Sequence, residues 1–413
     1  MLVNADLHIH SCFSAATSEK MRLPILAKEA QKKGIHLLAT GDCLHPLWLK
    51  EIKELNRVDE GTFELNNTRF VLTTEVEDSN RVHHLIIFPS LSAVEEFKIA
   101  VKGKTYNLDS DGRPNIAMNG AEVAELAKEV DALIGCSHAF TPWTALYAYH
   151  DSLKECYGDL TNYVSFVELG LSADSSYADR IKELASKTFL TNSDSHSPYP
   201  LRLAREFNRF ELEEINFEEL KNAILRQGRR KIVLNVGVPP EEGKYNETAC
   251  IKCYKHYRVE DAIALRWRCD NCGARIKKGV KDRINELADY DRPIHPDHRP
   301  PYLHLIPLTE IIAKALQQSS PLTNKVFASW NELIKEFKTE VNVLVDAELE
   351  DIAKVADVRI GSAIKAFREG KIIVHPGGGG QYGIIELPES LEDKEYFKLE
   401  TIKKSFQKKI FEF

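Results

Sequence analysis

Histidines and carboxylates recur at the ends of short apolar runs in the first half of the chain. The first run delivers Asp6-Leu7-His8-Ile9-His10, and because side chains alternate along a strand, both imidazoles face one side. A mixture of imidazoles and carboxylates without thiolates suits zinc, manganese or iron. The pattern therefore predicts a metal site with ligands for two or three ions. The further candidate ligands are Asp42, Glu75, His84, His138, Asp194 and His196.

Taken one at a time, these residues have simpler explanations. An isolated His-x-His pair is weak evidence for a metal, and Asp194-Ser195-His196 alone is compatible with a turn. His83 and His84 are adjacent, so at least one of them lies outside the cluster, and we assign His84 to it. The repetition of ligand types at one predicted strand end after another favours a shared site.

The elements that must position these residues alternate up to about Val233. Helix-like segments such as 24–33 and 121–130 lie between the apolar runs, which predicts an α/β domain, either a β/α barrel or an open sheet. The carboxyl ends of strands in such folds converge, so we expect the candidate ligands around one cavity. The predicted strands are residues 5–9, 36–39, 70–73, 85–88, 132–135, 166–169 and 189–191.

Two Cys-x-x-Cys pairs, Cys250/Cys253 and Cys269/Cys272, follow with 15 residues between them. This spacing is typical of a structural zinc site with four thiolates and no open position for catalysis. Two disulfides are the alternative, but the N-terminus lacks a basic stretch followed by an apolar run, so we expect reduced thiols.

Basic residues surround these cysteines although the whole chain is acidic, with a formal charge of −7. Residues 221–283 carry 16 lysines and arginines against 7 aspartates and glutamates. Basic side chains interleaved with aromatic ones suit phosphates and bases, whereas a solvated basic face is the simpler alternative. We predict DNA contacts from Lys255, Arg258, Arg266, Trp267 and Arg268.

The amino-acid composition indicates which class of protein this is. Hydrophobic residues make up 43% and charged residues 28%, which is ordinary globular composition, and no apolar run approaches the length of a membrane span. We expect a cytoplasmic protein with no membrane contact. Helices are predicted at 308–317, 330–338 and 348–368, before the glycine-rich segment 376–380.

The order of the candidate ligands resembles the PHP (polymerase and histidinol phosphatase) superfamily. That order is His-x-His, an aspartate, a glutamate, a histidine before an apolar run, another histidine and Ser193-Asp194-Ser195-His196. The resemblance implies a distorted seven-stranded β/α barrel in which zinc, manganese or magnesium ions serve phosphoester hydrolysis. His8, His10, Glu75 and Asp194 would form the catalytic cluster, with Asp42, His84, His138 and His196 completing the metal site.

One departure from the superfamily affects the metal count. Gly41-Asp42-Cys43 stands where the superfamily usually has Thr-Asp-His, so one metal position is either altered or supplied by Asp42. Glu168 is a further candidate ligand.

The combination of a PHP barrel, a four-cysteine zinc module and a helical region resembles the archaeal endonuclease Q family across nearly the whole chain. The supporting motifs are Asp6-Leu7-His8-Ile9-His10-Ser11, Val82-His83-His84-Leu85-Ile86-Ile87-Phe88-Pro89, Gly170-Leu171-Ser172-Ala173-Asp174 and Asn192-Ser193-Asp194-Ser195-His196-Ser197-Pro198. The resemblance implies an endonuclease that nicks damaged DNA 5′ of hypoxanthine, uracil, xanthine or an abasic site. Trp143 and residues 172–177 follow barrel strands and are candidates for the base pocket.

These parts give four regions: a PHP barrel at 1–236, a basic zinc-binding module at 237–292, a helical DNA-handling domain at 293–390 and a tail at 391–413. In the tail, Gln407, Ile410 and Phe413 are similar in spacing to the peptide that docks repair proteins on the sliding clamp. An amphipathic terminal turn would have the same spacing.

Two other functions compete with the endonuclease. A small-molecule phosphoesterase of the histidinol phosphatase type explains the barrel but gives no role to the cysteines and the basic segment. A non-hydrolytic DNA-binding or replisome adaptor with a degenerate barrel is favoured slightly by Cys43 and opposed by the nearly complete ligand set.

Overall fold

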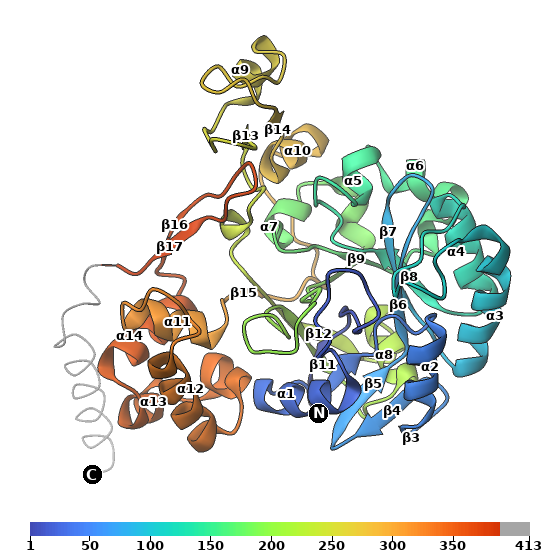
Figure 1. The fold of residues 1–413 in the computed structure, drawn as a ribbon, viewed down its shortest axis with the longest axis horizontal. Helices are drawn as coiled ribbons and strands as arrows, with labels where there is room; N and C mark the ends of the chain where they lie inside the picture. Colours follow the sequence, from blue (N-terminus) through green and yellow to red (C-terminus); the bar gives the residue numbers. More distant parts are fainter. Residues whose placement is uncertain (389–413) are drawn as a thin grey trace.

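The computed structural model describes residues 1–388. Figure 1 shows a large α/β unit, a four-cysteine module (residues 238–292) that projects from one side of it, and a helical unit beside both. The first sheet has the strand order β15-β12-β11-β1-β2-β5-β4-β3, and the second has the order β10-β9-β8-β7-β6. The bounds in the first sheet are β1 Leu2–Asp6, β2 Leu37–Ala39, β3 Asn56–Arg57, β4 Thr62–Leu65, β5 Thr68–Val71, β11 Phe207–Glu211, β12 Lys231–Gly237 and β15 Tyr302–His304.

Helices flank both sheets, and the second sheet mixes parallel and antiparallel pairs. Its strands are β6 Thr73–Glu77, β7 His83–Ile87, β8 Leu133–Cys136, β9 Phe166–Glu168 and β10 Thr188–Leu190. The helices of this unit are α1 Leu23–Lys33, α2 Pro46–Lys53, α3 Leu91–Val101, α4 Gly120–Glu129, α5 Leu146–Tyr149, α6 Leu153–Tyr157, α7 Ser175–Ala178 and α8 Phe217–Ile224. Short 3-10 turns are η1 Lys102–Lys104, η2 Gly158–Asn162, η3 Lys182–Ser186 and η4 Pro240–Glu242.

The two sheets enclose one apolar core. A cluster of buried side chains draws on strands of both sheets and on α8, as expected for a filled barrel rather than a pore. On one side the chain runs almost directly from β5 into β6. Most candidate ligands lie above this core and beyond the carboxyl ends of strands, whereas Glu75 lies within β6 and His83 begins the antiparallel strand β7.

On the other side, buried asparagines bridge the seam between the sheets. Asn208 pairs with the backbone of Thr191, donating to its carbonyl at 2.7 Å and accepting from its N–H at 2.9 Å. Asn235 donates to the carbonyl of Phe189 at 3.2 Å. Side-chain amides therefore replace backbone hydrogen bonds between the two sheets here. The α/β class is confirmed, whereas the count of seven barrel strands stays a prediction.

The four-cysteine module is inserted between two neighbouring strands. β12 and β15 pair in parallel, with Val236 opposite Leu303, so the segment after residue 293 returns to the first sheet before it becomes helical. The predicted domain boundary at 293 assigned this strand to the helical region. The module itself contains β13 Ala249–Cys250, α9 Val259–Ala264, β14 Ile276–Lys277 and α10 Val280–Leu287.

The helical unit follows β15. The prediction of one helix over 348–368 is wrong, because the chain breaks before Asp357, whose carboxylate caps the second helix by accepting from the N–H of Arg359 at 2.9 Å. The elements are α11 Leu308–Ala315, α12 Asn324–Phe337, the π-helical turn η5 Asn342–Asp346, α13 Leu349–Val355, α14 Val358–Arg368, β16 Ile373–His375 and β17 Ile384–Glu386.

The β16–β17 hairpin ties the helical unit to the base of the module (Figure 1). Its glycine-rich tip packs against residues 244–250: Gly380 donates to the carbonyl of Lys244 at 2.8 Å. Gly379 has φ +65°, and a Cβ there would lie 2.2 Å from the carbonyl oxygen of Cys250. Only glycine permits this approach.

Candidate metal centre

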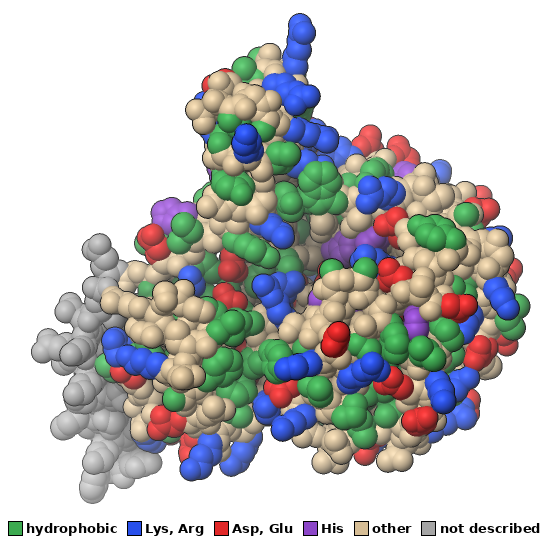
Figure 2. Space-filling view, viewed as in Figure 1, with side chains coloured by type: hydrophobic (Ala, Val, Ile, Leu, Met, Phe, Trp, Pro, Cys, Tyr) green, Lys and Arg blue, Asp and Glu red, His purple; other side chains and the backbone are tan. Residues whose placement is uncertain are grey.

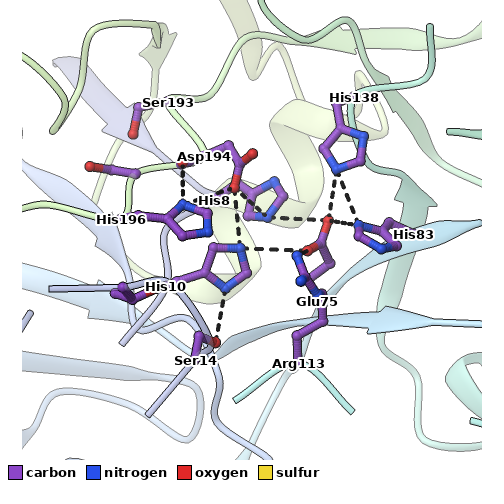
Figure 3. A network of polar contacts seen from close by, with 12 residues as sticks. His8, His10, Ser14, Glu75, His83, Arg113, His138, Ser193, Asp194 and His196 are labelled. Atoms are coloured by element: carbon purple, nitrogen blue, oxygen red, sulfur yellow. Dashed lines mark hydrogen bonds and ion pairs between the residues drawn. The ribbon is translucent and has the colours of Figure 1, made fainter. Parts of the chain in front are cut away.

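Four side chains from three parts of the barrel rim meet at the centre of the site (Figure 3). Nε2 of His10 lies 3.1 Å from Asp194 Oδ1 and 3.5 Å from Glu75 Oε2. Nε2 of His8 lies 3.5 Å from Glu75 Oε1. Both Nε2 atoms and Asp194 Oδ1 are buried without a hydrogen-bond partner. Convergent, unpartnered donor atoms of this kind fit a bound cation.

Two further groups share residues with this centre. Glu75 Oε1 lies 3.1 Å from both His83 Nδ1 and His138 Nε2. His196 lies with its ring centroid 4.5 Å from that of His10. Three sets of potential ligand atoms, each within 4.8 Å of one another, thus overlap at His10 and Glu75. The overlap suits neighbouring ions that share a carboxylate.

Two predicted ligands lie behind the histidines instead of beside them. Glu168 accepts from His8 Nδ1 at 2.8 Å, and Asp42 Oδ1 lies 3.1 Å from His10 Nδ1. Both carboxylates are fully buried, and neither belongs to a ligand group. The structure thus places Asp42 and Glu168 behind the imidazoles, a position from which carboxylates orient histidine ligands and favour a proton on Nδ1; their assignment as direct ligands stays a prediction.

The assignment of His84 to the cluster is corrected, because adjacent residues of β7 face opposite sides and His83 occupies the inner one. His84 Nε2 pairs with Asp78 Oδ2 at 3.2 Å and Nδ1 with the hydroxyl of Tyr157 at 2.8 Å. Cys156 lies beside this pair. His84 thus belongs to a separate buried group with Asp78 and Cys156, whose potential ligand atoms also lie within 4.8 Å of one another.

The charges of the centre support one another. Burial disfavours the charged imidazole of His8, but the carboxylates of Glu168 and Glu75 outweigh it and raise its pKa well above the usual value. Burial likewise opposes ionisation of Asp194, but the imidazole of His10 at 3.1 Å and the charge on His8 hold the pKa of Asp194 below its usual range. The carboxylates are therefore anionic at neutral pH, the form that binds a cation.

Three residues of the site have left-handed backbone conformations. The φ angles are +47° at Asp42, +46° at Asp194 and +31° at His138. Such conformations cost about 1–3 kcal/mol each for residues with a side chain, and they cluster at functional sites. No motif in the sequence indicates them.

Sequence reasoning missed Arg113 altogether. Its Nη1 lies 3.3 Å from Glu75 Oε2 (Figure 3). It comes from a loop between η1 and α4 that has neither periodicity nor a recognisable motif, so no signal was available in the sequence.

The four cysteines of the module come together as predicted. Their sulfur atoms form one potential ligand group, and the closest pairs, Cys250–Cys272 and Cys253–Cys269, are 3.5 Å apart. These separations exclude disulfides, which need about 2.05 Å. Burial opposes the Cys269 thiolate, but hydrogen bonds from Tyr257 and the backbone lower its pKa to about 6.

The five residues predicted to contact DNA differ in their surroundings. Lys255 is paired with Asp270 at 2.8 Å, and Arg258 with Asp261 at 3.0 Å. Arg266 and Arg268 have no carboxylate partner among residues 1–388, and Trp267 lies under the ammonium of Lys278 at 5.5 Å. Figure 2 shows basic side chains gathered over the outer part of the module.

Both candidates for the base pocket contact the module. Lys277 lies 3.9 Å above the ring of Trp143, whose edge meets Tyr245 at 5.9 Å between centroids. Within the loop 172–177, the hydroxyl of Tyr177 accepts from Asn246 at 3.3 Å. The predicted clamp-docking residues Gln407, Ile410 and Phe413 lie outside the described residues.

Within the part of the chain that the structure describes, no helix is long and apolar enough to cross a membrane.

A family model described as the MJ0043 C-terminal domain matches residues 307–371. The uncharacterized protein MJ0043 of Methanocaldococcus jannaschii is 44% identical over 261 residues, which cover 62% of this chain and 32% of that protein. The chain thus matches about a third of the length of this curated relative.

Two solved structures match nearly the whole chain. The crystal structure of the lesion-specific endonuclease PfuEndoQ from Pyrococcus furiosus is 51% identical, with a TM-score of 0.91, and the match covers 95% of this chain and 97% of that one. Endonuclease Q in complex with a 27-mer duplex carrying an abasic lesion at the active site has the same identity and TM-score, with 95% and 98% covered.

Proposed function

The chain belongs to the endonuclease Q family, and from this premise we propose that it is a DNA repair endonuclease. It would hydrolyse the phosphodiester on the 5′ side of hypoxanthine, uracil, xanthine or an abasic site. The observation that carries the proposal is the convergence of unpartnered buried atoms of His8, His10 and Asp194 at the barrel rim. Cations held by these atoms would attract the negative charge of a phosphodiester.

The ligands of two or three divalent ions, zinc, manganese or magnesium, would be seven side chains. Ions held there activate the attacking water and neutralise charge on the phosphate. Asp42 and Glu168 keep the Nδ1 protons of His10 and His8 in place, so that each Nε2 presents its lone pair. The proposed ligands are His8, His10, Glu75, His83, His138, Asp194 and His196.

The four-cysteine module would bind one structural zinc and contact the phosphates of the DNA duplex. Four thiolates leave no coordination position open, so this zinc contributes stability and no catalysis. Arg266 and Arg268, which lack acidic partners among the described residues, are the strongest phosphate contacts of the five predicted residues. A damaged base must leave the duplex to be inspected, and Trp143 and residues 172–177 lie where the barrel meets the module.

A nicking assay tests the function. Purified protein with each divalent metal is incubated with end-labelled duplexes that carry one hypoxanthine, uracil, xanthine, abasic site or undamaged base. The expected product is a cut 5′ of the lesion. Asp194→Asn is the matched control, which should abolish cleavage and keep DNA affinity within a few fold because the carboxylate holds metal. Wild-type turnover by this variant with unchanged metal content would remove Asp194 from the site.

The same protein tests the competing functions. Turnover of histidinol phosphate without nicking of any duplex would favour the small-molecule phosphoesterase. Lesion-specific binding without a cut in any metal would favour the non-hydrolytic adaptor.

We further propose, from the sequence alone, that Gln407, Ile410 and Phe413 dock on the sliding clamp. Removing residues 405–413 should abolish clamp binding and clamp stimulation without changing basal nicking of a short duplex. Wild-type clamp affinity in the truncated protein, or a loss of basal nicking, would show that the docking assignment is wrong.

A further inference from the structure

Arg113 lies beside the candidate metal centre on a loop whose backbone is anchored to the barrel. This loop is anchored to β6, the strand of Glu75, by the pairing of Glu77 with Asn115: Asn115 Nδ2 donates to Glu77 Oε1 at 2.6 Å. Gly112 makes the close approach possible, since a Cβ there would lie 2.2 Å from Oδ2 of Asp42. The guanidinium is thus delivered to the centre by a fixed backbone.

The guanidinium of Arg113 has N–H donors that are not used by the described residues. Among residues 1–388, the side chain of Arg113 makes one hydrogen-bonded ion pair, from Nη1 to Glu75. The side chain keeps 30% of its surface exposed. Arg299 shows the contrast: its side chain is 2% exposed and bonds Asp179 and two backbone carbonyls. Arg299 is saturated by the protein, whereas Arg113 presents free N–H groups toward solvent.

Electrostatics indicate what these groups bind. Glu75 is the nearest counter-charge of the guanidinium, at 3.3 Å, and Asp194 and Asp111 act on it from farther away. Once cations share the charges of Glu75 and Asp194, the site favours a further anion beside Arg113. A phosphodiester supplies that anion, because its non-bridging oxygens match the planar fork of arginine. The charge on these oxygens is the charge that an in-line displacement must stabilise.

We propose that Arg113 binds a non-bridging oxygen of the scissile phosphate and is a catalytic residue of this enzyme. The inference rests on the proposed endonuclease function. It assigns a phosphate subsite on the Glu75 side of the centre, supplied by a side chain that binds no metal.

The test compares Arg113→Ala and Arg113→Lys with a matched control, Arg81→Ala. Arg81 is exposed and close by: after the hydrogen bond of His83, the charges of Arg81 and Arg113 both help to lower the pKa of Glu77. Only Arg113 reaches Glu75. The control therefore separates direct contact from the general positive field.

Single-turnover nicking, metal content and thermal unfolding are measured for each variant. Arg113→Ala should lower the nicking rate about 10²–10³-fold, as loss of one transition-state donor does, with metal content and unfolding temperature equal to those of Arg81→Ala. Arg113→Lys should recover part of the rate, because the charge remains and the fork is lost.

A substrate with a neutral methylphosphonate at the scissile linkage gives a readout that a merely structural role would not move. The penalty of Arg113→Ala should shrink on this substrate, since the charged oxygen is gone. An unchanged penalty, a variant that nicks like Arg81→Ala, or metal loss in proportion to activity would each overturn the inference. A wild-type protein that nicks no lesion duplex would overturn the proposed function instead.

Discussion

Asp42 controls which nitrogen of His10 carries a proton, and its replacement by asparagine should be far more harmful than its distance from the ligand atoms suggests. Oδ2 of Asp42 accepts three donors: the N–H of Ser11 at 2.6 Å, its hydroxyl at 2.7 Å and the hydroxyl of Ser14 at 2.8 Å. Oδ1 faces His10 Nδ1 at 3.1 Å. A carboxylate satisfies both sides.

An asparagine cannot satisfy both sides. Its amide oxygen must face the backbone N–H of Ser11, which can only donate, and this turns the NH₂ group toward Nδ1 of His10 and forces Nδ1 to become an acceptor. The proton then moves to Nε2, the atom 3.1 Å from Asp194 Oδ1, and blocks it as a ligand. Wrong-tautomer substitutions cost on the order of 10⁴-fold in kcat, so we expect about 10³–10⁴-fold, or about 4–5.5 kcal/mol.

Glu168→Gln is the matched comparison, because it also removes a buried carboxylate behind a histidine. Both oxygens of Glu168 reach His8 Nδ1, at 2.8 and 3.1 Å, and neither has another donor among the described residues. The glutamine oxygen can therefore accept the Nδ1 proton, and only charge is lost. We expect a loss of about 10–100-fold.

The assay is single-turnover nicking over a range of metal concentrations, with metal content and unfolding temperature measured alongside. Excess metal should rescue Glu168→Gln but not Asp42→Asn. Equal losses in the two variants, or a larger loss in Glu168→Gln, would refute the tautomer argument.

Three further predictions follow from the structure. His83→Ala should lose bound metal and nicking but unfold like the wild type. His84→Ala should keep metal and lose about 1–3 kcal/mol of stability in denaturant unfolding, because it leaves Oδ2 of buried Asp78 without its imidazole partner; the reverse pattern would restore His84 to the site. Cys269→Ser should lose about one zinc per chain by elemental analysis while the barrel transition persists in calorimetry, and unchanged zinc would contradict the four-cysteine assignment. Burial raises the pKa of Glu206 from 4.5 to about 8, so the folded state holds its proton more tightly and stability falls, by up to about 1.4 kcal/mol per pH unit, as pH rises from 4.5 to 8. Glu206→Gln should flatten this decline in unfolding curves from pH 5 to 9, and an equally steep decline in the variant would count against it.

Much of the site could be predicted because one physical rule places it. The carboxyl ends of barrel strands meet, so ligand types at predicted strand ends placed His8, Glu75 and Asp194 in one group, and the structure does bring these side chains together. The choice between His83 and His84 could not be made in this way. All of β7 is buried, so no alternation of polar and apolar residues shows which face is inward.

Residue type also does not reveal whether a side chain reaches the metal position itself or lies behind another ligand. Asp42 is a good ligand by type, yet three hydroxyl and backbone donors hold it behind His10. Arg113 lay beyond prediction because its loop has no period and its partner is distant in sequence. In the helical unit, the break before Asp357 carried a cap signal that helical periodicity across 348–368 concealed.

The position of the four-cysteine module between β12 and β15 makes it, in topological terms, an enlarged crossover. Parallel neighbours in a sheet need a connection of a dozen or more residues, commonly one helix. Here residues 238–301 serve as that connection and also present basic side chains to solvent. The segment leaves and rejoins the barrel at neighbouring strands, and it also contacts the barrel in between, where Arg283 donates to the carbonyls of Tyr147 and His150. A shorter crossover between Gly237 and Tyr302 would cut no strand but would remove these contacts. The module to which we assign DNA contacts is thus encoded between two adjacent strands of the barrel to which we assign the chemistry.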